Sequence, residues 1–207
     1  MTRNRLYRKT WGKVELVTGM FFLILMILIL AVHMQIMLFY ITSQFMEDAL
    51  AASNLASAVI DIEEYGRTHI LRIASPETAY VSYQEALKGN LQLNADWESS
   101  SKELAAGKVE ILEYIIYNVN GDDVTVSRFG QSGRSTWLEK GGVGKIKAPD
   151  GTLIETTSVY SRIGFPVEGI LGISTYAEKE KSVDVVSKAL AASEAEQTGK
   201  RRQTDSE

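Results

Sequence analysis

Few side chains in this chain could act as a catalytic base, a nucleophile or a metal ligand. Its 207 residues include two histidines, His33 and His69, and no cysteine. His33 lies in a long apolar run, so His69 is the one histidine available to a folded domain. The lack of cysteine excludes disulfides, thiolate zinc sites and a cysteine nucleophile. No HExxH or GxSxG pattern occurs, and GGVGKI lacks the first glycine and the final Ser or Thr of a phosphate-binding loop. We therefore expect no enzyme and no cofactor.

Two pairs of adjacent carboxylates are the next candidates for chemistry. Glu63 with Glu64, and Asp122 with Asp123, could form a glycosidase pair or part of a calcium site. Adjacency alone carries little information, because both functions need groups brought together from different elements. We expect the glutamates at the solvated end of a helix and the aspartates in a turn.

The elements that position these residues begin with a membrane-type helix. From Leu16 to Ile41 there is no formally charged residue, and a helix spans a bilayer with roughly 20 such residues. A cleaved signal peptide has an apolar core of only about 7–15 residues. The pattern therefore predicts a retained transmembrane helix over residues 14–41.

Flanking charge predicts the direction of this helix. Residues 1–13 are basic and contain no acidic residue, whereas Glu47 and Asp48 are the first charges after the apolar run. Lys and Arg near a spanning helix stay in the cytoplasm. We expect residues 1–13 to form a cytoplasmic basic tail of a single-pass cell-membrane protein whose C-terminal domain is extracytoplasmic.

The helix is predicted to continue beyond the membrane over residues 42–65. No Pro or Gly interrupts the chain between Gly19 and Gly66, and three- and four-residue steps predict one buried helical face. That face either packs on the chain's own domain or meets other subunits. Its members are Met46, Ala49, Leu50, Ala52, Ala56, Val59 and Ile60.

Residues 66–190 are predicted to form an external α+β domain with short helices followed by an antiparallel β-sheet. Ser75 and Pro76 open a helix over 76–88, and a second short helix is expected around 97–105. Trp97 and Trp137 could be ligand platforms, although one buried and one exposed tryptophan is the more ordinary arrangement.

The strands of this domain are predicted from β-rich runs and turn residues. Residues 108–119 and 124–129 flank the turn Asn120–Asp123 and predict one hairpin. A glycine-rich connection follows, and a second hairpin is expected around the turn at 149–151. Pro166 and Gly169 are expected to interrupt the chain before another strand. Residues 183–190 complete a last strand or pass into the tail, and residues 191–207 are expected to be disordered.

Two stretches give the chain a resemblance to a known family. Gly12, Val14 and Glu15 follow a basic N-terminus and open a hydrophobic helix with an amphipathic second half. Residues 156–172, TTSVYSRIGFPVEGILG, hold a tyrosine followed by Phe-Pro. This layout resembles type IV pilin-like proteins, and within that group the TadE/TadF-like minor pilins, or pseudopilins, of tight-adherence systems.

The resemblance implies a helix-assembly residue and a processing region. Glu15 would pair with the N-terminal amine of a neighbouring subunit, and the processing region would be Thr10, Trp11, Gly12 and Lys13. In processed pilins the glutamate becomes the fifth residue. Cleavage after Gly12 would leave Glu15 third, and cleavage after Thr10 would make it fifth. An uncleaved anchor that assists assembly is the alternative.

The composition and the resemblance together predict a structural function. We expect a non-enzymatic, membrane-anchored component of a tight-adherence pilus or secretion apparatus. Its partners would be membrane lipid and other pilin-like or pilus-assembly subunits, through the long helix. A net charge of -4 argues against nucleic acid as a partner. The alternatives are a single-pass extracytoplasmic sensor or ligand-binding protein that acts through a partner, and a membrane-anchored hydrolase.

Overall fold

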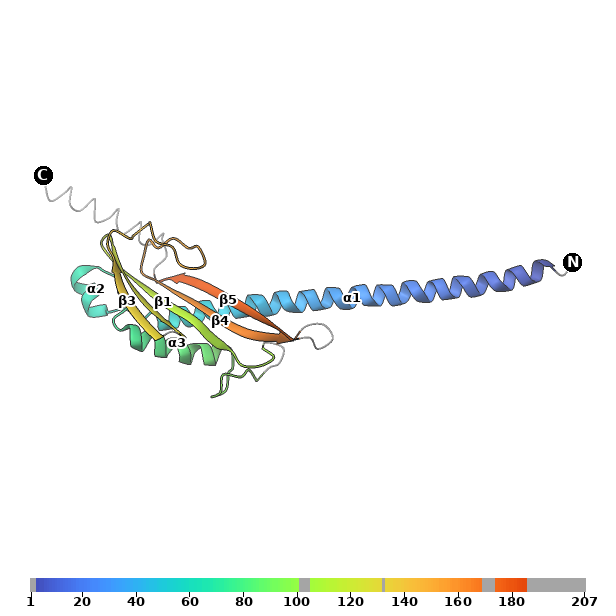
Figure 1. The fold of residues 1–207 in the computed structure, drawn as a ribbon, viewed down its shortest axis with the longest axis horizontal. Helices are drawn as coiled ribbons and strands as arrows, with labels where there is room; N and C mark the ends of the chain where they lie inside the picture. The colour runs from blue at the N-terminus through green and yellow to red at the C-terminus, as the bar shows by residue number, and fades with distance from the viewer. Residues whose placement is uncertain (1–2, 101–104, 132, 169–173, 186–207) are drawn as a thin grey trace. The chain divides into compact units, whose positions relative to one another are not determined.

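The computed structural model describes residues 3–100, 105–131, 133–168 and 174–185, with side chains described from Val14 onward. The chain forms two compact units, Met1–Thr42 and Ser43–Glu207, and we call the second the sheet unit. Helix α1 (Arg3–Ser57) begins in the first unit and ends in the second (Figure 1). We call Val14–Thr42 its apolar segment and Ser43–Ser57 its packed segment.

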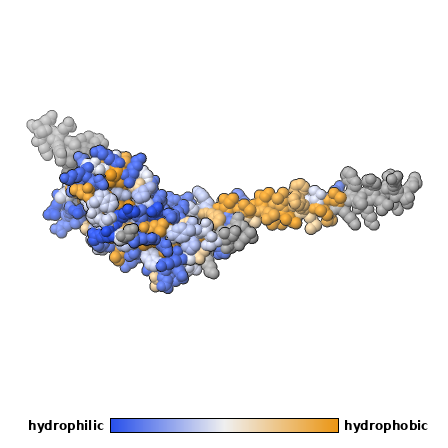
Figure 2. Space-filling view, in the orientation of Figure 1, coloured by the Kyte–Doolittle hydropathy of each residue, from blue (hydrophilic) through white to orange (hydrophobic). Residues whose placement is uncertain are grey.

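The apolar segment is long and hydrophobic enough to cross a membrane. Its best window has a mean hydropathy of 2.7 and none of that window is buried. Figure 2 shows it as a continuous hydrophobic surface. A helix of this kind near the N-terminus suits a membrane anchor, and a signal sequence has the same properties. The prediction of a long apolar N-terminal helix is confirmed.

The first helix ends earlier than predicted, and α2 (Ile62–Thr68) is a separate element. Ile60 forms a β-bridge with Ile73. The Asp61 side chain accepts a hydrogen bond from the backbone N–H of Glu64 at 2.9 Å and caps α2. The prediction of one uninterrupted helix over 42–65 is wrong, because this bridge and this new N-cap break the helical path.

The buried face of the packed segment is narrower and more polar than predicted. Met46, Ala49 and Leu50 are buried, as expected. At a period of 3.6 residues the same face continues through polar positions, which are Ser53, Asn54 and Ser57. The predicted set spread beyond one face, and three of its members are exposed, namely Ala52, Ala56 and Val59.

Helix α3 (Pro76–Asn90) forms where its local signals predict. The Ser75 hydroxyl accepts a hydrogen bond from the backbone N–H of Thr78 at 3.3 Å, and Pro76 occupies the first turn. Its buried residues recur every four positions and face the sheet, and they are Ala79, Tyr83 and Leu87.

The five described strands form one antiparallel sheet in the order β3-β2-β1-β4-β5. The first predicted hairpin is confirmed, with Gly121 at φ 60° in its turn. The strands are β1 (Glu110–Asn120), β2 (Asp123–Gly130), β3 (Gly133–Glu139), β4 (Ser158–Glu168) and β5 (Ser174–Asp184).

The two faces of the sheet have different covers. On the helix-side face, the packed segment of α1 and α3 cover the sheet (Figure 1) and bury the main core. In this core the rings of Tyr83 and Tyr114 stack at 4.6 Å between centroids. On the opposite, loop-side face, residues 140–157 cover a smaller core that includes Ile115, Ile154 and Tyr160. Helices precede the antiparallel strands, so the α+β class is confirmed.

Two parts of the predicted strand pattern are wrong. Strand β3 occupies residues that were assigned to a connection. The second hairpin is reduced to a turn with one isolated bridge between Lys147 and Leu153, because β4 pairs with β1 and β5 instead. The expected short helix around 97–105 is also wrong for its first part, since residues 97–100 are not helical. Residues 101–104 lie outside the described residues.

Strand β4 runs through Pro166, which was expected to interrupt the chain. The Pro166 carbonyl accepts a hydrogen bond from the backbone N–H of Ala106. Because the nitrogen and the carbonyl of one strand residue point to the same side, the Pro166 nitrogen also points to that side. It lies beyond Glu110 and Gly164, the last pair between β1 and β4. A missing N–H there removes no ladder bond. Strand β5 follows and ends at Asp184. The described residues end at Val185, so the predicted continuation to residue 190 lies outside them. The same holds for the predicted disordered tail, 191–207.

Candidate functional site

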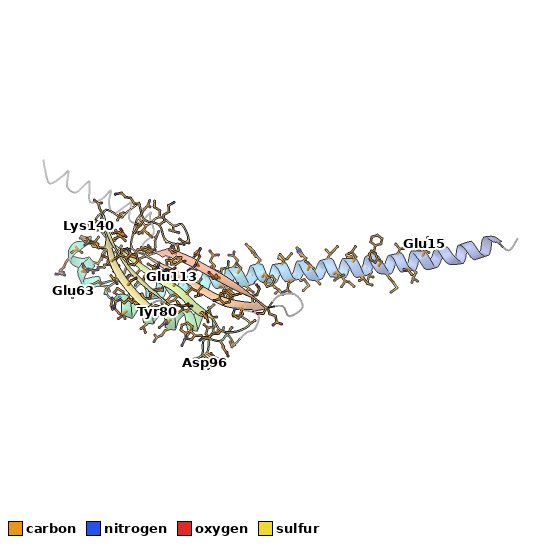
Figure 3. All side chains as sticks on the ribbon, viewed as in Figure 1. Glu15, Glu63, Tyr80, Asp96, Glu113 and Lys140 are labelled. Atoms are coloured by element: carbon orange, nitrogen blue, oxygen red, sulfur yellow. The ribbon has the colours of Figure 1, made fainter. Side chains whose placement is uncertain are left out.

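Helix α1 holds the residues that the family resemblance singles out. Thr10, Trp11, Gly12 and Lys13 belong to the helical backbone, and the described side chains begin just after them. Glu15 is exposed beside the first apolar residues (Figure 3). Its carboxylate is therefore accessible to a partner.

Polar contacts join the packed segment to the strands and to α3, in addition to the burial of Met46 and Leu50 in the main core. The Asn54 amide donates to the Lys181 carbonyl at 2.8 Å, and the Tyr114 hydroxyl donates to Ser57 Oγ at 2.8 Å. The Asn90 amide donates to Ser53 Oγ at 2.9 Å. These bonds connect α1 with β5, β1 and α3, so this part of the helix is an integral layer of the fold.

A partly exposed ion pair lies at the N-terminal end of the contact between the packed segment and β5. Lys181 Nζ donates to Glu47 Oε1 at 2.6 Å. This hydrogen bond, together with the charge of Lys181, holds the pKa of the Glu47 carboxyl below its usual range. The pair thus holds the last described strand against the first helix near neutral pH.

Large apolar side chains are exposed on the packed segment and just after it. Phe45 is 38% exposed, Leu55 57% and Val59 58%. Leu55 lies on the side of α1 opposite its buried face, and Val59 follows two residues after the helix ends. They form a candidate contact surface for another protein or for lipid.

A buried carboxylate lies on the loop-side face of the sheet. Glu113, labelled in Figure 3, has a side chain that is 5% exposed. It contacts two guanidinium groups. Its Oε1 lies 2.5 Å from Arg128 Nε, and its Oε2 lies 3.6 Å from Arg162 Nη2. Arg162 also lies 3.7 Å from Glu178. We call Glu113, Arg128 and Arg162 the charge cluster.

A hollow of about 450 Å³ opens beside this cluster on the same face. Ile115 and Val126 line it from the strands, and Lys147 and Pro149 line it from residues 140–157. Trp137 lines it from the edge strand β3 and is 40% exposed. Its size lies in the range of small-molecule sites, about 300–1,000 Å³.

The polar groups of the hollow are only partly satisfied by the protein. Tyr117 is 5% exposed and lines the hollow, and its hydroxyl has no hydrogen-bond partner among the described residues. Burial, followed by the nearby Glu113 carboxylate, raises the pKa of Tyr117 to about 12. The Trp137 indole N–H donates to Glu139 Oε1 at 2.9 Å, and the side chain is 40% exposed.

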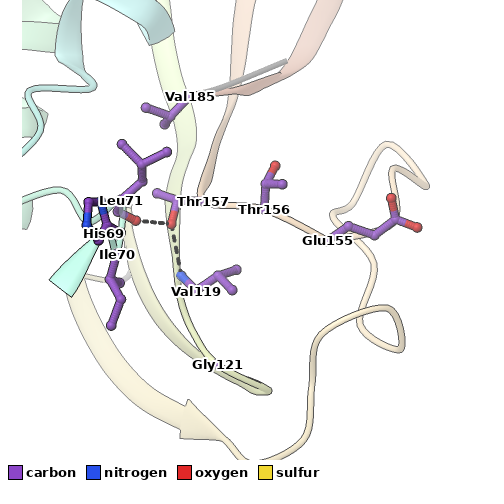
Figure 4. A pocket seen from close by; sticks show the side chains of 9 residues that line it. All are labelled: His69, Ile70, Leu71, Val119, Gly121, Glu155, Thr156, Thr157 and Val185. Carbon is purple, nitrogen blue, oxygen red and sulfur yellow. Dashed lines mark hydrogen bonds between the residues drawn. The ribbon is translucent and has the colours of Figure 1, made fainter. Parts of the chain in front are cut away.

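His69 lies in a smaller pocket of about 220 Å³ (Figure 4). It ends α2 at φ 57°, and its ring meets that of Tyr65 edge-on. The same pocket contains Thr157, whose hydroxyl donates to the Leu71 carbonyl at 2.6 Å and accepts from the Val119 N–H at 3.0 Å. These hydrogen bonds hold the segments around the strand ends together, so we assign this pocket a structural function.

The carboxylate pairs have structural environments. Glu64 lies in the first turn of α2, 3.8 Å from Arg72, and Glu63 is exposed beside it. Asp123 Oδ1 accepts a hydrogen bond from the backbone N–H of Gly141 at 2.8 Å. Within the described ranges, no three His, Asp or Glu side chains gather as metal ligands would.

Trp97 and Trp137, the two tryptophans of the sheet unit, differ in exposure, although neither is fully buried. Trp97 is half-buried, with Lys88 Nζ 4.5 Å from its ring centroid, whereas Trp137 is exposed beside the hollow.

The chain matches no family model, no curated protein and no solved structure. Its function must therefore be argued from these surfaces alone.

Sequence reasoning missed the charge cluster and the hollow. A signal was present, since Glu113, Arg128 and Arg162 are charged residues inside β-rich runs. A charge among residues that become buried needs a partner across the sheet. The strand order that brings these three together could not be read from the individual runs.

Proposed function

We propose that this chain is a non-enzymatic, membrane-anchored, pilin-like structural or assembly component of a tight-adherence pilus or secretion apparatus. One observation carries the proposal: α1 provides both an apolar segment with no buried residue and a packed segment that is part of the sheet unit's core. A simple tether needs only the first. The apolar segment would lie in the membrane, with the N-terminus cytoplasmic and the sheet unit extracytoplasmic.

The uncovered side of the packed segment supports a function in assembly. Leu55 leaves an apolar surface on α1, whose opposite side is already buried, and Phe45 and Val59 are further exposed apolar side chains before and after it in the chain. Neighbouring pilin-like subunits would cover this surface, because helix packing removes it from water.

A photocrosslinking experiment in the producing cells tests this assignment. A photoreactive phenylalanine analogue replaces Leu55, and the matched control replaces Val81 on α3, which is 52% exposed against 57% for Leu55. We expect Leu55 to crosslink to small membrane proteins of a pilus-like apparatus and Val81 not to do so. Equal crosslinking from both positions, or capture of a signalling kinase from Leu55, would refute the proposal.

Glu15 provides a second test. In Glu15→Gln we expect normal membrane insertion and reduced recovery of partner subunits, because the neutral amide cannot form an ion pair with a neighbouring amine. Glu63→Gln, an exposed carboxylate on α2, is the control. Co-purification from crosslinked membranes measures assembly, and intact-mass analysis shows whether the chain is cut near residues 10–13. Unchanged partner recovery would remove Glu15 from the assembly function.

An extracytoplasmic ligand-binding protein or sensor is the second candidate function. The hollow beside Trp137 and Tyr117 favours it, since it combines an aromatic face with an unsatisfied hydroxyl. Capture of a kinase from Leu55 would favour this function over the first.

A further inference from the structure

The hollow on the loop-side face offers both donors and acceptors around an aromatic ring. Arg128 and Lys147 are donors, and Glu139 is an acceptor. The Tyr117 hydroxyl can donate and accept, and no described residue uses it. A molecule that enters the hollow can therefore form bonds that the protein alone leaves unmade.

Charge in the hollow is balanced. Among the described residues that line it, Glu113 and Glu139 are acidic, and Arg128 and Lys147 are basic. Glu113 already accepts from Arg128, and Glu139 already accepts from the Trp137 indole. A ligand with a full charge would leave one sign without compensation, so balance favours a neutral polar ligand.

We propose that this hollow binds a neutral saccharide. Each sugar hydroxyl both donates and accepts, which suits a site where donors and acceptors alternate. One face of a pyranose ring is lined by C–H groups and can lie against the exposed ring of Trp137. Tyr117 bonds a ring hydroxyl from the bottom of the hollow, and Arg128 and Lys147 bond others at its edge. Neighbouring apolar side chains, Ile115 and Val126, exclude water.

The site is independent of the pilin-like function, because it uses none of the α1 surfaces, and it specifies the ligand class of the second candidate function. A failure of the glycoside-binding experiment therefore leaves the pilin-like function unaffected, and a failure of the crosslinking experiment leaves the saccharide site unaffected. The full chain is placed in lipid nanodiscs that contain no glycolipid and are prepared without glycoside detergents, whose sugar headgroups would compete. Saturation-transfer NMR then records binding of methyl glycosides of glucose, galactose, mannose and N-acetylglucosamine, with benzoate as an anionic aromatic competitor.

Matched variants locate the binding. Trp137→Ala should weaken glycoside binding by about tenfold or more, whereas Leu138→Ala, the next exposed side chain on the same strand, should leave it unchanged because it points to the opposite face. Tyr117→Phe, which removes only the hydroxyl, should weaken binding by about threefold to tenfold. Near-UV circular dichroism of each variant confirms that the sheet unit is folded.

Three results would overturn the proposal. The first is the absence of saturation transfer to every glycoside at millimolar concentration. The second is binding that Trp137→Ala and Tyr117→Phe leave unchanged in folded protein, which would place the saccharide elsewhere. The third is binding of benzoate without any glycoside, which would make the ligand an aromatic acid.

Discussion

Glu113 shows how one residue ties three strands together. Its carboxylate is almost fully buried in β1 and receives guanidinium groups from β2 and β4. A buried carboxylate is costly unless it is paired, and here both oxygens have a cation within reach. The cluster also leaves Arg128 at the edge of the hollow, so the same residue stabilises the sheet and lines a candidate binding site.

Replacing Glu113 should destabilise the sheet unit. In Glu113→Gln the amide cannot neutralise two guanidinium groups, and we expect the free energy of unfolding to fall by about 2 kcal/mol. Glu178→Gln, which removes the more exposed partner of Arg162, should cost less than about 1 kcal/mol. Urea unfolding followed by near-UV circular dichroism measures both. Equal losses of unfolding free energy in the two variants would show that the burial of Glu113 does not increase its contribution to stability.

The Glu47–Lys181 pair should make attachment of the packed segment depend on pH. Because the pKa of Glu47 is lowered in the folded state, its contribution is present above the ordinary value of 4.5 and is lost as pH falls through the folded value. We expect Glu47→Gln to cost about 0.2–1 kcal/mol at pH 7 and nothing at strongly acidic pH. Urea midpoints of the two proteins across pH 2–7 measure the difference. A gap that widens in acid would contradict this assignment.

At the scale of elements, local signals determine the capping of α3. Ser75 supplies a hydroxyl to the exposed N–H of Thr78, and no described side chain duplicates that bond. In Ser75→Ala we expect a loss of about 1 kcal/mol in unfolding free energy. Ser75→Asp should retain most of the stability because its carboxylate can accept the same bond. Chemical denaturation of the three proteins provides the comparison, and an equal loss in both variants would exclude capping as the cause.

Elements with local signals were predictable, and those that depend on distant partners were not. Ser75 with Pro76, and the turn at Asn120–Asp123, are visible in a few adjacent residues, and α3 and the first hairpin form there. β3 was missed because it lies in a glycine-rich stretch and becomes a strand only by pairing with β2. The end of α1 was missed for a related reason, since Ile60 leaves the helix to pair with Ile73.

The candidate functional residues divide in the same way, into those with a local sequence signal and those that depend on distant partners. Glu15 and the apolar segment were found from sequence because charge and hydropathy mark them directly. The hollow was not, since Tyr117, Trp137 and Lys147 come from three separate segments. Trp137 was recognised as a possible ligand platform, but its neighbours depend on strand register, which fixes the face each side chain occupies.

At the scale of the whole molecule, the division of the chain falls inside a helix. The sheet unit begins at Ser43, so it includes the packed segment of α1. Met46 and Leu50 are 1% and 0% exposed in its main core. The boundary of the folded unit is therefore not the end of the first helix.

Two truncations should separate these boundaries. A chain that starts at Ser43 should be soluble and folded, whereas one that starts at Ala58 loses Met46 and Leu50 from the core and should unfold. The expected loss exceeds about 5 kcal/mol, which is comparable with the whole stability of a small domain. Near-UV circular dichroism and urea unfolding of both chains measure this. A cooperative transition from the shorter chain would show that the packed segment is dispensable.

The contact between Glu47 and Lys181 also sets an order of events during biosynthesis. The two residues are 134 positions apart, and Asn54 reaches the same strand. At about 5–20 residues per second, synthesis separates the two ends of this contact by roughly ten seconds. During that interval the helix has emerged but its partner strand does not exist. A nascent chain therefore exposes Met46 and Leu50 to whatever escorts it, and a holding chaperone has its longest opportunity there.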